Sequence, residues 1–370
     1  MKLLTVVGAR PQFIKAAAVS RVLRRRATEV LLHTGQHYDY GMSEVFFREL
    51  SLPAPDYNLG VGSGNHGAQT AQMLAGIEDI ILKEKPDIML VYGDTNSTLA
   101  GALSAVKLHI PIAHVEAGLR SYKKTMPEEI NRVLTDHCSA LLFCPTSTAV
   151  ANLAKEGITG GVHNVGDVMY DALLYYTADS AEHSAIFGKL SISPRHYYLA
   201  TIHRAENTDR PERLSALIEA VCEAPEPVVL PLHPRTRAII AGGPLEDKLK
   251  KAPHVTITEP VGYLEMLQLE KHARAIVTDS GGIQKEAYLL GVPCITLRDE
   301  TEWVETVEAG ANILAGAGKE IIVKAMADFT LDGKERPPFY GDGRASEKIT
   351  DLLCNFIGNE AAGAGSQSQP

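Results

Sequence analysis

The stretch that decides the fold of this 370-residue chain is Ile276-Val-Thr-Asp-Ser-Gly-Gly-Ile-Gln-Lys-Glu286. It predicts a buried strand ending at Thr278, a glycine turn and a helix that begins at once. The unpaired N–H groups and partial positive charge of a helix N-terminus suit phosphate. We therefore expect Ser280, Gly281 and Gly282 to hold a phosphate group and Glu286 to accept hydrogen bonds from a ribose. The alternative is a tight turn with Ser280 as its N-cap.

The same alternation of strand and helix runs through the chain and restarts after about residue 175. Short runs rich in Val, Ile and Leu predict strands at 3–7, 29–33, 88–91, 112–115 and 141–144, and again at 197–201, 228–232, 255–258, 275–278 and 294–297. Strands of this composition that alternate with helices indicate parallel sheets covered on both faces. We therefore predict an α/β fold of two Rossmann-like domains, with parallel sheets that face each other across a cleft.

Amphipathic stretches supply the helices between these strands. We expect helices at 13–25, 42–49, 67–83, 96–107, 128–138, 211–223, 263–272, 284–290 and 345–357. The N-terminal domain should span 1–170 and the C-terminal domain 171–344, with helix 345–358 joined to the first. Residues 359–370 have no large apolar group to bury, so we expect a disordered tail.

Composition excludes several classes of protein. The net charge of −9 gives no general reason to bind nucleic acid or anionic lipid. The five cysteines form no C-x-x-C pair, which favours reduced thiols and shows no zinc pattern. Since no apolar run approaches the length of a membrane span or a signal peptide, we expect a cytoplasmic protein without a membrane partner.

A second glycine turn opens the chain at Val7-Gly-Ala-Arg-Pro-Gln-Phe-Ile-Lys15. Here too a strand passes directly into a helix, with Pro11 suited to the first helical turn. Two fixed cations, Arg10 and Lys15, beside a strand end suit a diphosphate. The alternative is that Lys15 is a solvated helix charge and Arg10 a member of a surface ion pair.

Three acids follow neighbouring strands. Asp94 comes after the strand at 88–91, Glu116 after the strand at 112–115, and Glu128 opens the next helix. Like charges in one cleft push their pKa values apart, so such a set can divide acid and base roles. The alternatives are an N-cap for Asp94 and a first-turn helix acid for Glu128 and its neighbour Glu129. Glu116 is the hardest to explain structurally, because an unpaired carboxylate in an apolar strand end is costly.

Two histidines follow strands of the second half, His203 in His-Arg-Ala-Glu-Asn207 and His233 in His-Pro-Arg235. A metal site is conceivable, but there is no H-x-x-x-H and no cysteine at useful spacing. Phosphate binding or proton transfer is therefore the preferred role.

Taken together, these motifs resemble the non-hydrolysing UDP-N-acetylglucosamine 2-epimerase family over about residues 1–358. The resemblance rests on Gly8-Ala-Arg-Pro, Tyr92-Gly-Asp-Thr, His114-Val-Glu-Ala-Gly-Leu-Arg, Pro127-Glu-Glu-Ile-Asn-Arg, His203-Arg-Ala-Glu-Asn and Asp279-Ser-Gly-Gly-Ile-Gln-Lys-Glu, in that order. It implies the GT-B-like architecture of two Rossmann-like domains and a homodimer. It also implies inversion of C2 of a UDP-linked N-acetyl hexosamine by elimination and re-addition of UDP, without metal or redox cofactor.

The resemblance also assigns roles. Asp94, Glu116 and Glu128 become acid/base candidates, with His203 in the catalytic set. The implied substrate ligands are Arg10, Lys15, Arg132, His233, Ser280, Gly281, Gly282, Glu286 and Trp303.

One departure concerns the turn Thr301-Glu-Trp-Val-Glu305, where many members have arginine in place of Trp303. Losing that charge means that the sugar or phosphate contact there differs. The segment from Arg298 to Glu305 resembles the corresponding segment of one branch of this family. Members of that branch act on UDP-2,3-diacetamido-2,3-dideoxy-glucuronate and make its manno epimer for surface polysaccharides. Either this uronate or UDP-N-acetylglucosamine is the expected substrate.

Three other functions remain open from the sequence. They are a glycosyltransferase of the same architecture, a hydrolysing epimerase that releases UDP, and a nucleotide-sugar sensor without activity. The ordered acid set favours proton abstraction over simple transfer.

Overall fold

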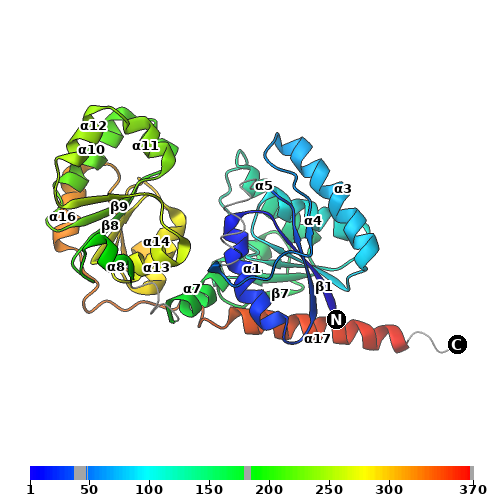
Figure 1. Ribbon diagram of the computed structural model, residues 1–370. Helices are drawn as coiled ribbons and strands as arrows, with labels where there is room; N and C mark the ends of the chain where they lie inside the picture. Colours follow the sequence, from blue (N-terminus) through cyan, green and yellow to red (C-terminus); the bar gives the residue numbers. More distant parts are fainter. Residues whose placement is uncertain (37–46, 48, 179–184, 367–370) are drawn as a thin grey trace. The chain divides into compact units, whose positions relative to one another are not determined.

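The computed structural model describes residues 1–36, 47, 49–178 and 185–366 and divides the chain into two units (Figure 1). The first unit is Met1–Leu174 with Pro338–Pro370, and the second is Tyr175–Pro337. The helix expected at 42–49 lies almost entirely outside the described residues.

The first unit is built on a parallel sheet with the order β3-β2-β1-β4-β5-β6-β7 among the described strands. Its strands are β1 Lys2–Val7, β2 Thr28–His33, β3 Tyr57–Asn58, β4 Ile88–Tyr92, β5 Ile112–Val115, β6 Leu141–Cys144 and β7 Val162–Asn164. The parallel register pairs Leu3 with both Glu29 and Ile88. The sequence did not predict β3 and β7, because these edge strands are too short to show an apolar run.

Helices cover this sheet. They are α1 Arg10–Leu23, α3 His66–Glu84, α4 Asn96–Lys107, α5 Pro127–Cys138, α6 Ser147–Lys155, α7 Val168–Ala178 and α17 Ala345–Ser366. Helices α3, α4 and α5 pack side by side, and α1 packs on α17. The strand side chains Leu4, Val6 and Val91 are buried with Met73 and Ile77 of α3 in one core, so both the strands and the inner helix face are withdrawn from water.

The second unit repeats the plan with a parallel sheet of order β10-β9-β8-β11-β12-β13. Its strands are β8 Tyr198–Thr201, β9 Val228–Pro231, β10 Val255–Thr258, β11 Ala275–Thr278, β12 Cys294–Thr296 and β13 Asn312–Leu314. Its helices are α8 Ala185–Leu190, α9 Ala205–Thr208, α10 Pro211–Cys222, α11 Pro234–Ile240, α12 Pro244–Lys250, α13 Tyr263–Lys271, α14 Gly281–Leu290, α15 Val304–Glu308 and α16 Lys319–Asp328. The prediction of an α/β fold with two parallel sheets is confirmed.

Both faces of the second sheet are buried, as its composition indicates. Ile276 and Val277 are neighbours on β11, yet they belong to two different hydrophobic clusters. Successive side chains of a strand point to opposite faces, so each face has its own apolar layer beneath a set of helices. The sheet of the second unit therefore lies between two apolar layers.

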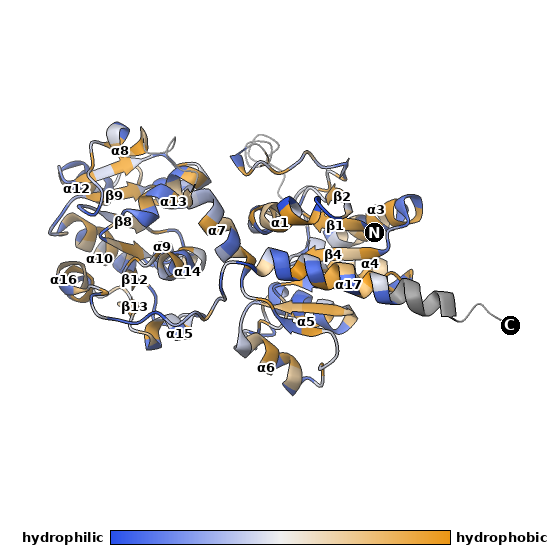
Figure 2. Cartoon of the chain, turned by 90° about the horizontal axis from the view of Figure 1, so that it is seen from below, coloured by the Kyte–Doolittle hydropathy of each residue, from blue (hydrophilic) through white to orange (hydrophobic). Residues whose placement is uncertain are grey.

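The C-terminal helix corrects one expectation. Helix α17 runs from Ala345 to Ser366, through residues where we expected a disordered tail. The predicted tail contains Ala361, Ala362 and Ala364, and alanine has the highest helix propensity, so a helix already anchored on α1 continues. Its amphipathic stripe is visible in Figure 2 as alternating hydrophilic and hydrophobic colour along its first turns. In the described part of the chain, no helix is long and apolar enough to cross a membrane.

None of the five cysteines forms a disulfide, and two of them are strand residues in the cores. Cys144 on β6 and Cys294 on β12 are buried. Burial disfavours the charged thiolate and raises the pKa of both thiols to about 12.

We therefore expect Cys144 and Cys294 to resist alkylation in the folded protein. Iodoacetamide at near-neutral pH should leave both unmodified while the half-buried Cys354 reacts, because almost no thiolate is present at the two buried sites. Peptide mass mapping measures this, with urea-unfolded protein as the control in which all five react. Rapid native labelling of Cys294 would contradict its burial.

Candidate active site

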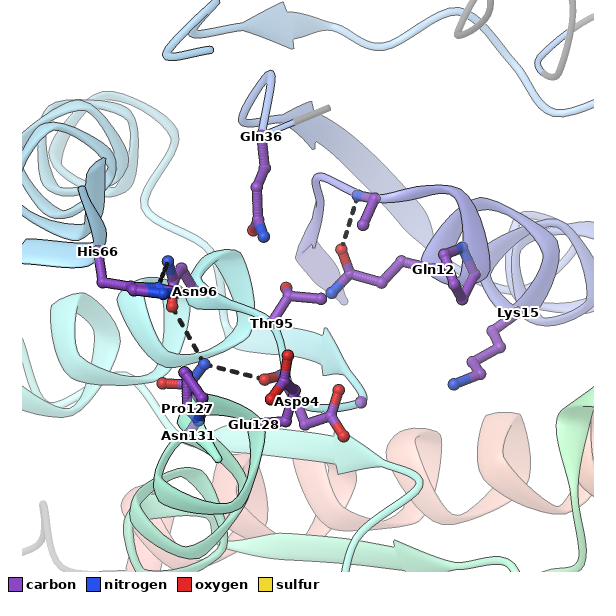
Figure 3. Close-up of a pocket in the computed structure, with 13 residues that line it drawn as sticks. Gln12, Lys15, Gln36, His66, Asp94, Thr95, Asn96, Pro127, Glu128 and Asn131 are labelled. Carbon is purple, nitrogen blue, oxygen red and sulfur yellow. Dashed lines mark hydrogen bonds between the residues drawn. The ribbon is translucent and has the colours of Figure 1, made fainter. Parts of the chain in front are cut away.

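A cavity of about 200 Å³ lies at the carboxyl edge of the sheet in the first unit (Figure 3). It receives residues from the turns after β1 and β4 and from the start of α5. In parallel α/β sheets, ligands bind at this edge because all the turns from strand to helix meet there. Lys15, Asp94 and Glu128 line the cavity together, so three of the predicted site residues share one space.

Gln12 joins the first two turns. It is buried, and its side-chain oxygen accepts hydrogen bonds from the backbone N–H groups of Gly8 and Ala9 at 2.8 and 3.0 Å. Its amide nitrogen donates to the Tyr92 carbonyl at 2.8 Å and to Thr98 at 3.0 Å. One glutamine therefore fixes the turn after β1 against the turn that carries Asp94.

Lys15 and Glu116 form an ion pair beside the cavity, and both side chains are largely buried. Glu116 has φ of 72°, in the left-handed region that glutamate rarely adopts. Such backbone strain costs about 1–3 kcal/mol and persists only where surrounding contacts impose it. The strained turn aims the carboxylate toward Gly93, where a methyl group would lie 3.3 Å from Glu116 Oε2. The structure thus holds a buried carboxylate against both the Asp94 turn and a cation.

Asp94 is held in a similar way by Arg132, which forms ion pairs with Asp94 and Glu129. Arg132 lies on α5, so the helix that carries Glu128 also carries the cation for Asp94. The expected role of Arg132 as a substrate ligand is therefore accompanied by a role in holding an acid. Asp94 and Glu116 thus each have a fixed cation in the folded chain.

The two neighbouring glutamates of α5 have different environments. Glu128 is exposed and lines the cavity. Glu129 is buried and accepts hydrogen bonds from the backbone N–H groups of Ser121 and Tyr122 at 2.8 and 2.9 Å. Burial by itself raises the pKa of Glu129, but these bonds and Arg132 hold it below its usual value. The structural alternative for first-turn acids therefore fits Glu129, whereas Glu128 faces the cavity.

Neutral polar groups form the other wall of the cavity. Asn131 donates to the Asp94 carbonyl at 2.9 Å and to Asn96 at 3.2 Å. Asn96 in turn donates to Gln69 at 2.8 Å, and Gln69 donates to the Gly62 carbonyl at 2.7 Å. Because carbonyl acceptors stand at both ends, the orientation of each amide in this chain is determined.

Arg10 differs from Lys15. It begins α1 with an exposed side chain and is not among the described residues that line the cavity. The expectation that both cations project to the same strand end therefore holds in this cavity for Lys15 and not for Arg10, because the first residue of a helix and the sixth lie on different sides of its axis.

In the second unit, Asp279 organises the carboxyl edge of the sheet. It is fully buried, and its carboxylate accepts from His203 Nδ1 at 2.8 Å and from the backbone N–H groups of His203 and Arg204, each at 2.9 Å. Burial alone raises the pKa of Asp279, but His203 and these amides hold it below its usual value. His203 is thereby fixed, and its ring lies 5.4 Å from that of His233. Burial, followed by the charge of His203, lowers the pKa of His233.

The glycine turn after β11 has the predicted conformation. Ser280 is the N-cap of α14, and its hydroxyl accepts from the backbone N–H of Ile283 at 3.4 Å. The capping alternative is thus present, and the long bond leaves the helix N-terminus weakly capped. Glu302 and Arg204 both lie next to Gly281, and Glu302 pairs with Arg298 at 2.6 Å. The Glu302 carboxylate, paired with Arg298, therefore lies beside the first residue of α14.

Trp303 lies on the same helix N-terminus. Its indole N–H donates to the Gly281 carbonyl at 2.8 Å. The Lys285 ammonium lies 4.8 Å from the centre of the indole ring, a cation–π distance. Glu286, one turn further, is buried and accepts from the Tyr263 hydroxyl at 3.3 Å. Trp303 is therefore held in place next to Gly281.

Several residues of these sites were not singled out by the sequence. Asp279 and Gln12 lie inside the quoted motifs, but their roles depend on backbone groups that no pattern displays. Arg204, Arg298, Glu302 and Asn131 likewise gain their places only through folding. Among the described residues, no group of three or more His, Cys, Asp or Glu side chains is placed to hold a metal ion.

Comparison with known proteins gives the family. The model of the UDP-N-acetylglucosamine 2-epimerase family matches residues 21–354. A UDP-N-acetylglucosamine 2-epimerase homolog of Methanococcus maripaludis is 55% identical over 357 residues, covering 96% of this chain and 100% of the relative. The UDP-2,3-diacetamido-2,3-dideoxy-D-glucuronate 2-epimerase of Pseudomonas aeruginosa is 50% identical over 365 residues, covering 96% and 100%.

Solved structures agree. The crystal structure of Methanocaldococcus jannaschii UDP-GlcNAc 2-epimerase in complex with UDP-GlcNAc and UDP matches with a TM-score of 0.83 and 47% identity, over 96% of this chain and 100% of that one. The fold and these matches define a UDP-sugar isomerase of GT-B-like architecture. The chain belongs to the UDP-N-acetylglucosamine 2-epimerase family, which confirms the prediction made from its motifs.

The contrast between the two α5 glutamates can be tested. Glu129→Gln should lower the free energy of unfolding by about 1–3 kcal/mol at neutral pH, because a buried charged acceptor of two backbone amides is lost. Since the folded pKa of Glu129 lies below that of the unfolded chain, this stabilisation is lost as pH falls through the folded value. Glu128→Gln should leave the urea midpoint unchanged and reduce epimerase turnover. Equal destabilisation by both variants would contradict the different environments.

Proposed function

We propose that this chain inverts C2 of a UDP-linked N-acetyl hexosamine by eliminating UDP and adding it back. The observation that carries the proposal is the single cavity lined by Lys15, Asp94 and Glu128, with Glu116 paired to Lys15 at its side. Three acids close to one cavity, two of them paired with cations, suit the transfer of protons at one carbon.

The first half-reaction is an elimination. A carboxylate removes the hydrogen on C2, the C1–C2 double bond forms, and the C1–O bond breaks with its electron pair passing to the β-phosphate oxygen of UDP. The products are UDP and a 2-acetamido glycal. Because the C2 hydrogen is weakly acidic, this step needs a positioned base and stabilisation of the departing diphosphate.

The second half-reaction reverses the first on the other face of C2. A protonated acid delivers hydrogen to C2, and the UDP oxygen re-forms the bond to C1. Inversion requires removal of the proton on one face and delivery on the other, so at least two of Asp94, Glu116 and Glu128 take part. Elimination followed by addition is redox-neutral and needs no external oxidant.

The remaining predicted site residues are assigned to charge pairing and to the UDP group. Lys15 and Arg132 offset the repulsion among the acids through their ion pairs with Glu116 and Asp94. We assign the diphosphate of UDP to Ser280, Gly281 and Gly282 at the N-terminus of α14, with Glu286 on the ribose. His203 and His233 complete the proposed ligand set, and Arg10 and Trp303 remain proposed substrate contacts.

Exchange with solvent tests the proposal. In D₂O, sugar nucleotide recovered from the enzyme should carry deuterium at C2, because the abstracted proton equilibrates with water. Asp94→Asn or Glu116→Gln should reduce this exchange by about a hundredfold or more while UDP binding is retained. NMR of the recovered sugar and calorimetric titration with UDP provide the two measurements.

The same experiment separates the alternatives. A glycosyltransferase leaves C2 untouched, a hydrolysing epimerase accumulates free UDP and sugar, and a sensor binds without exchange. If both variants kept full turnover, the acid/base assignment would be wrong.

We propose that UDP-2,3-diacetamido-2,3-dideoxy-glucuronate is the substrate. UDP-N-acetylglucosamine is the alternative substrate. The segment from Arg298 to Glu305 supports the uronate, since Trp303 replaces an arginine next to Gly281 and Lys285 stands over the indole. The relative named for the uronate is 50% identical, and a Methanocaldococcus jannaschii UDP-N-acetylglucosamine 2-epimerase is 49% identical, so overall identity favours neither sugar.

Assay of both sugars with the purified enzyme decides between them. We expect kcat/KM for the uronate to exceed that for UDP-N-acetylglucosamine by about tenfold or more, the size of effect that one well-placed polar contact gives. Trp303→Arg should lower the ratio of kcat/KM for the uronate to kcat/KM for UDP-N-acetylglucosamine. Turnover of UDP-N-acetylglucosamine alone would contradict the uronate assignment.

We further propose a cytoplasmic homodimer that serves the synthesis of surface polysaccharide. The support is the family resemblance, because manno-configured amino sugars of this kind enter such polymers. Light scattering of the purified protein tests the dimer.

A further inference from the structure

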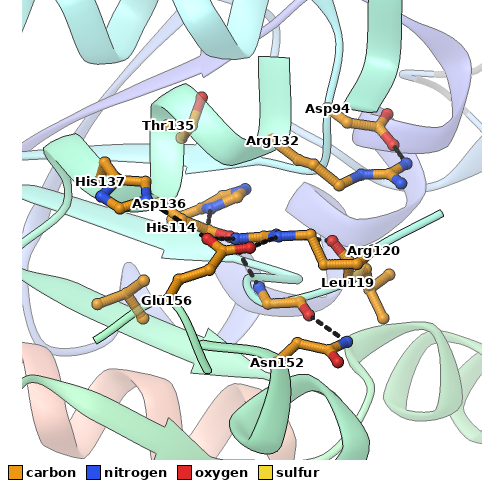
Figure 4. Close-up of polar contacts among 12 residues, drawn as sticks. Asp94, His114, Leu119, Arg120, Arg132, Thr135, Asp136, His137, Asn152 and Glu156 are labelled. Carbon is orange, nitrogen blue, oxygen red and sulfur yellow. Dashed lines mark hydrogen bonds and ion pairs between the residues drawn. The ribbon is translucent and has the colours of Figure 1, made fainter. Parts of the chain in front are cut away.

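A buried charged network links the three turns that carry the acid set (Figure 4). His114 on β5 is 0% exposed, and its Nε2 lies 2.7 Å from the carbonyl oxygen of Gly93, the residue directly before Asp94. Its Nδ1 lies 2.7 Å from Oδ1 of Asp136 on α5. One ring therefore connects the Asp94 turn to the helix that carries Glu128.

Asp136 continues the network to the third turn. Its Oδ2 accepts from the backbone N–H of Gly118 at 3.1 Å and from Arg120 at 2.7 Å. Gly118 lies two residues after Glu116 and has φ of 78°. Asp136 thus holds both sides of the strained Glu116 turn, with His114 before it and Gly118 after it.

The hydrogen-bond partners of the His114 ring determine which of its nitrogens faces Gly93. A carbonyl oxygen only accepts, so His114 Nε2 carries a hydrogen. Asp136 already receives two donors on its other oxygen. Burial by itself raises the pKa of Asp136, but His114 and Arg120 hold it below its usual value. The ring is thus held at both nitrogens, with Nε2 on the Gly93 carbonyl and Nδ1 on the Asp136 carboxyl group.

Arg120 brings a second carboxylate into the network. It donates to Glu156 through Nε and Nη2 at 2.7 and 2.8 Å, a bidentate pair. Arg120 thus bridges two carboxylates, Asp136 and Glu156, and His114 is hydrogen-bonded to the first of them. A buried charge is tolerated only with such partners, and removing one member leaves the others uncompensated.

We propose that His114 is a positioning residue of the epimerase. Anchored by Asp136, it fixes the Gly93 carbonyl and so sets the distance between Asp94 and Glu116. Gly93 lies beside the Glu116 carboxylate, since a Cβ added there would come within 3.3 Å of Glu116 Oε2. Because Asp94 follows Gly93 directly, a shift of Gly93 changes the spacing of the two acids. Misplacement of a catalytic group by about 1 Å costs about a hundredfold in rate.

Two substitutions of His114 by an amide side chain distinguish its hydrogen bond with Asp136 from its hydrogen bond with Gly93. In His114→Asn the side-chain nitrogen takes the place of Nδ1, so it donates to Asp136 and leaves the Gly93 carbonyl without its donor. In His114→Gln the nitrogen takes the place of Nε2 and donates to Gly93. We expect kcat to fall by about tenfold or more for His114→Asn, with KM changed by less than about threefold, and His114→Gln to recover most of the loss.

Asp136→Asn provides the second variant, because it keeps the shape and removes the charge that anchors the ring. It should lower kcat with KM unchanged while the Gly93 bond remains. His163→Asn and His163→Gln are matched controls, since His163 lies on β7 of the same sheet, half-buried, with Phe143 as its ring neighbour. Both controls should keep full turnover.

The inference rests on the proposed function, and the assay distinguishes failure of that function from failure of the positioning role. Wild-type enzyme that fails to exchange the C2 hydrogen in D₂O sinks the proposed function whatever the variants do. With active wild-type enzyme, three outcomes overturn the positioning role: equal kcat for His114→Asn and His114→Gln, a rise in KM in place of a fall in kcat, or losses that follow the urea midpoints. If His114→Asn does not fold, unchanged kcat in Asp136→Asn overturns it.

Discussion

The parallel pairing of β1, β4 and β5 is the constraint on which the first unit depends. Parallel strands end at the same edge of the sheet, so the turns after them must share a small space. Those turns carry a buried glutamine, an aspartate and a strained glutamate. The left-handed backbone of Glu116 is a cost that the neighbouring contacts impose, and it places a carboxylate where a regular strand end would not.

Charge pairing makes this crowding tolerable. Each acid that is held near the cavity has a fixed cation, Lys15 for Glu116 and Arg132 for Asp94. Behind them, His114 and Asp136 tie the same turns together from inside the fold. The cavity is therefore supported by a second layer of ionic hydrogen bonds, which is the arrangement that holds reacting groups still.

The second unit has a parallel sheet of the same kind, but the polar groups at its carboxyl edge differ. Its glycine turn presents a helix N-terminus, and Asp279 behind it fixes His203 through both side-chain and backbone bonds. Trp303 is bound to the Gly281 carbonyl, so the residue that departs from the usual family pattern is attached to the turn expected to hold phosphate. A change of one side chain there alters the contact surface without altering the helix.

Much of this could be predicted from the sequence alone. Local composition determined the strands at 112–115, 141–144 and 275–278 and the helix at 96–107, because long apolar or amphipathic runs leave one stable conformation. The order of the motifs determined the family. Asp94 could be nominated because it comes soon after a buried strand, and Lys15 and Glu128 because they stand in the first two turns of the helices that follow such strands.

Only the tertiary structure decided the partners. The pairs Lys15–Glu116, Arg132–Asp94 and His114–Gly93 join residues far apart in the chain, and nothing local marks which cation meets which acid. As first-turn acids of a predicted helix, Glu128 and Glu129 were equivalent, and only the family resemblance singled out Glu128. The structure separates them, because Glu128 lines the cavity and Glu129 caps a loop. The short strands β3, β7 and β13 were also missed, because they owe their conformation to the strands with which they pair. Sequence determines which conformations and chemistries are available, whereas packing decides which of the polar groups are brought together.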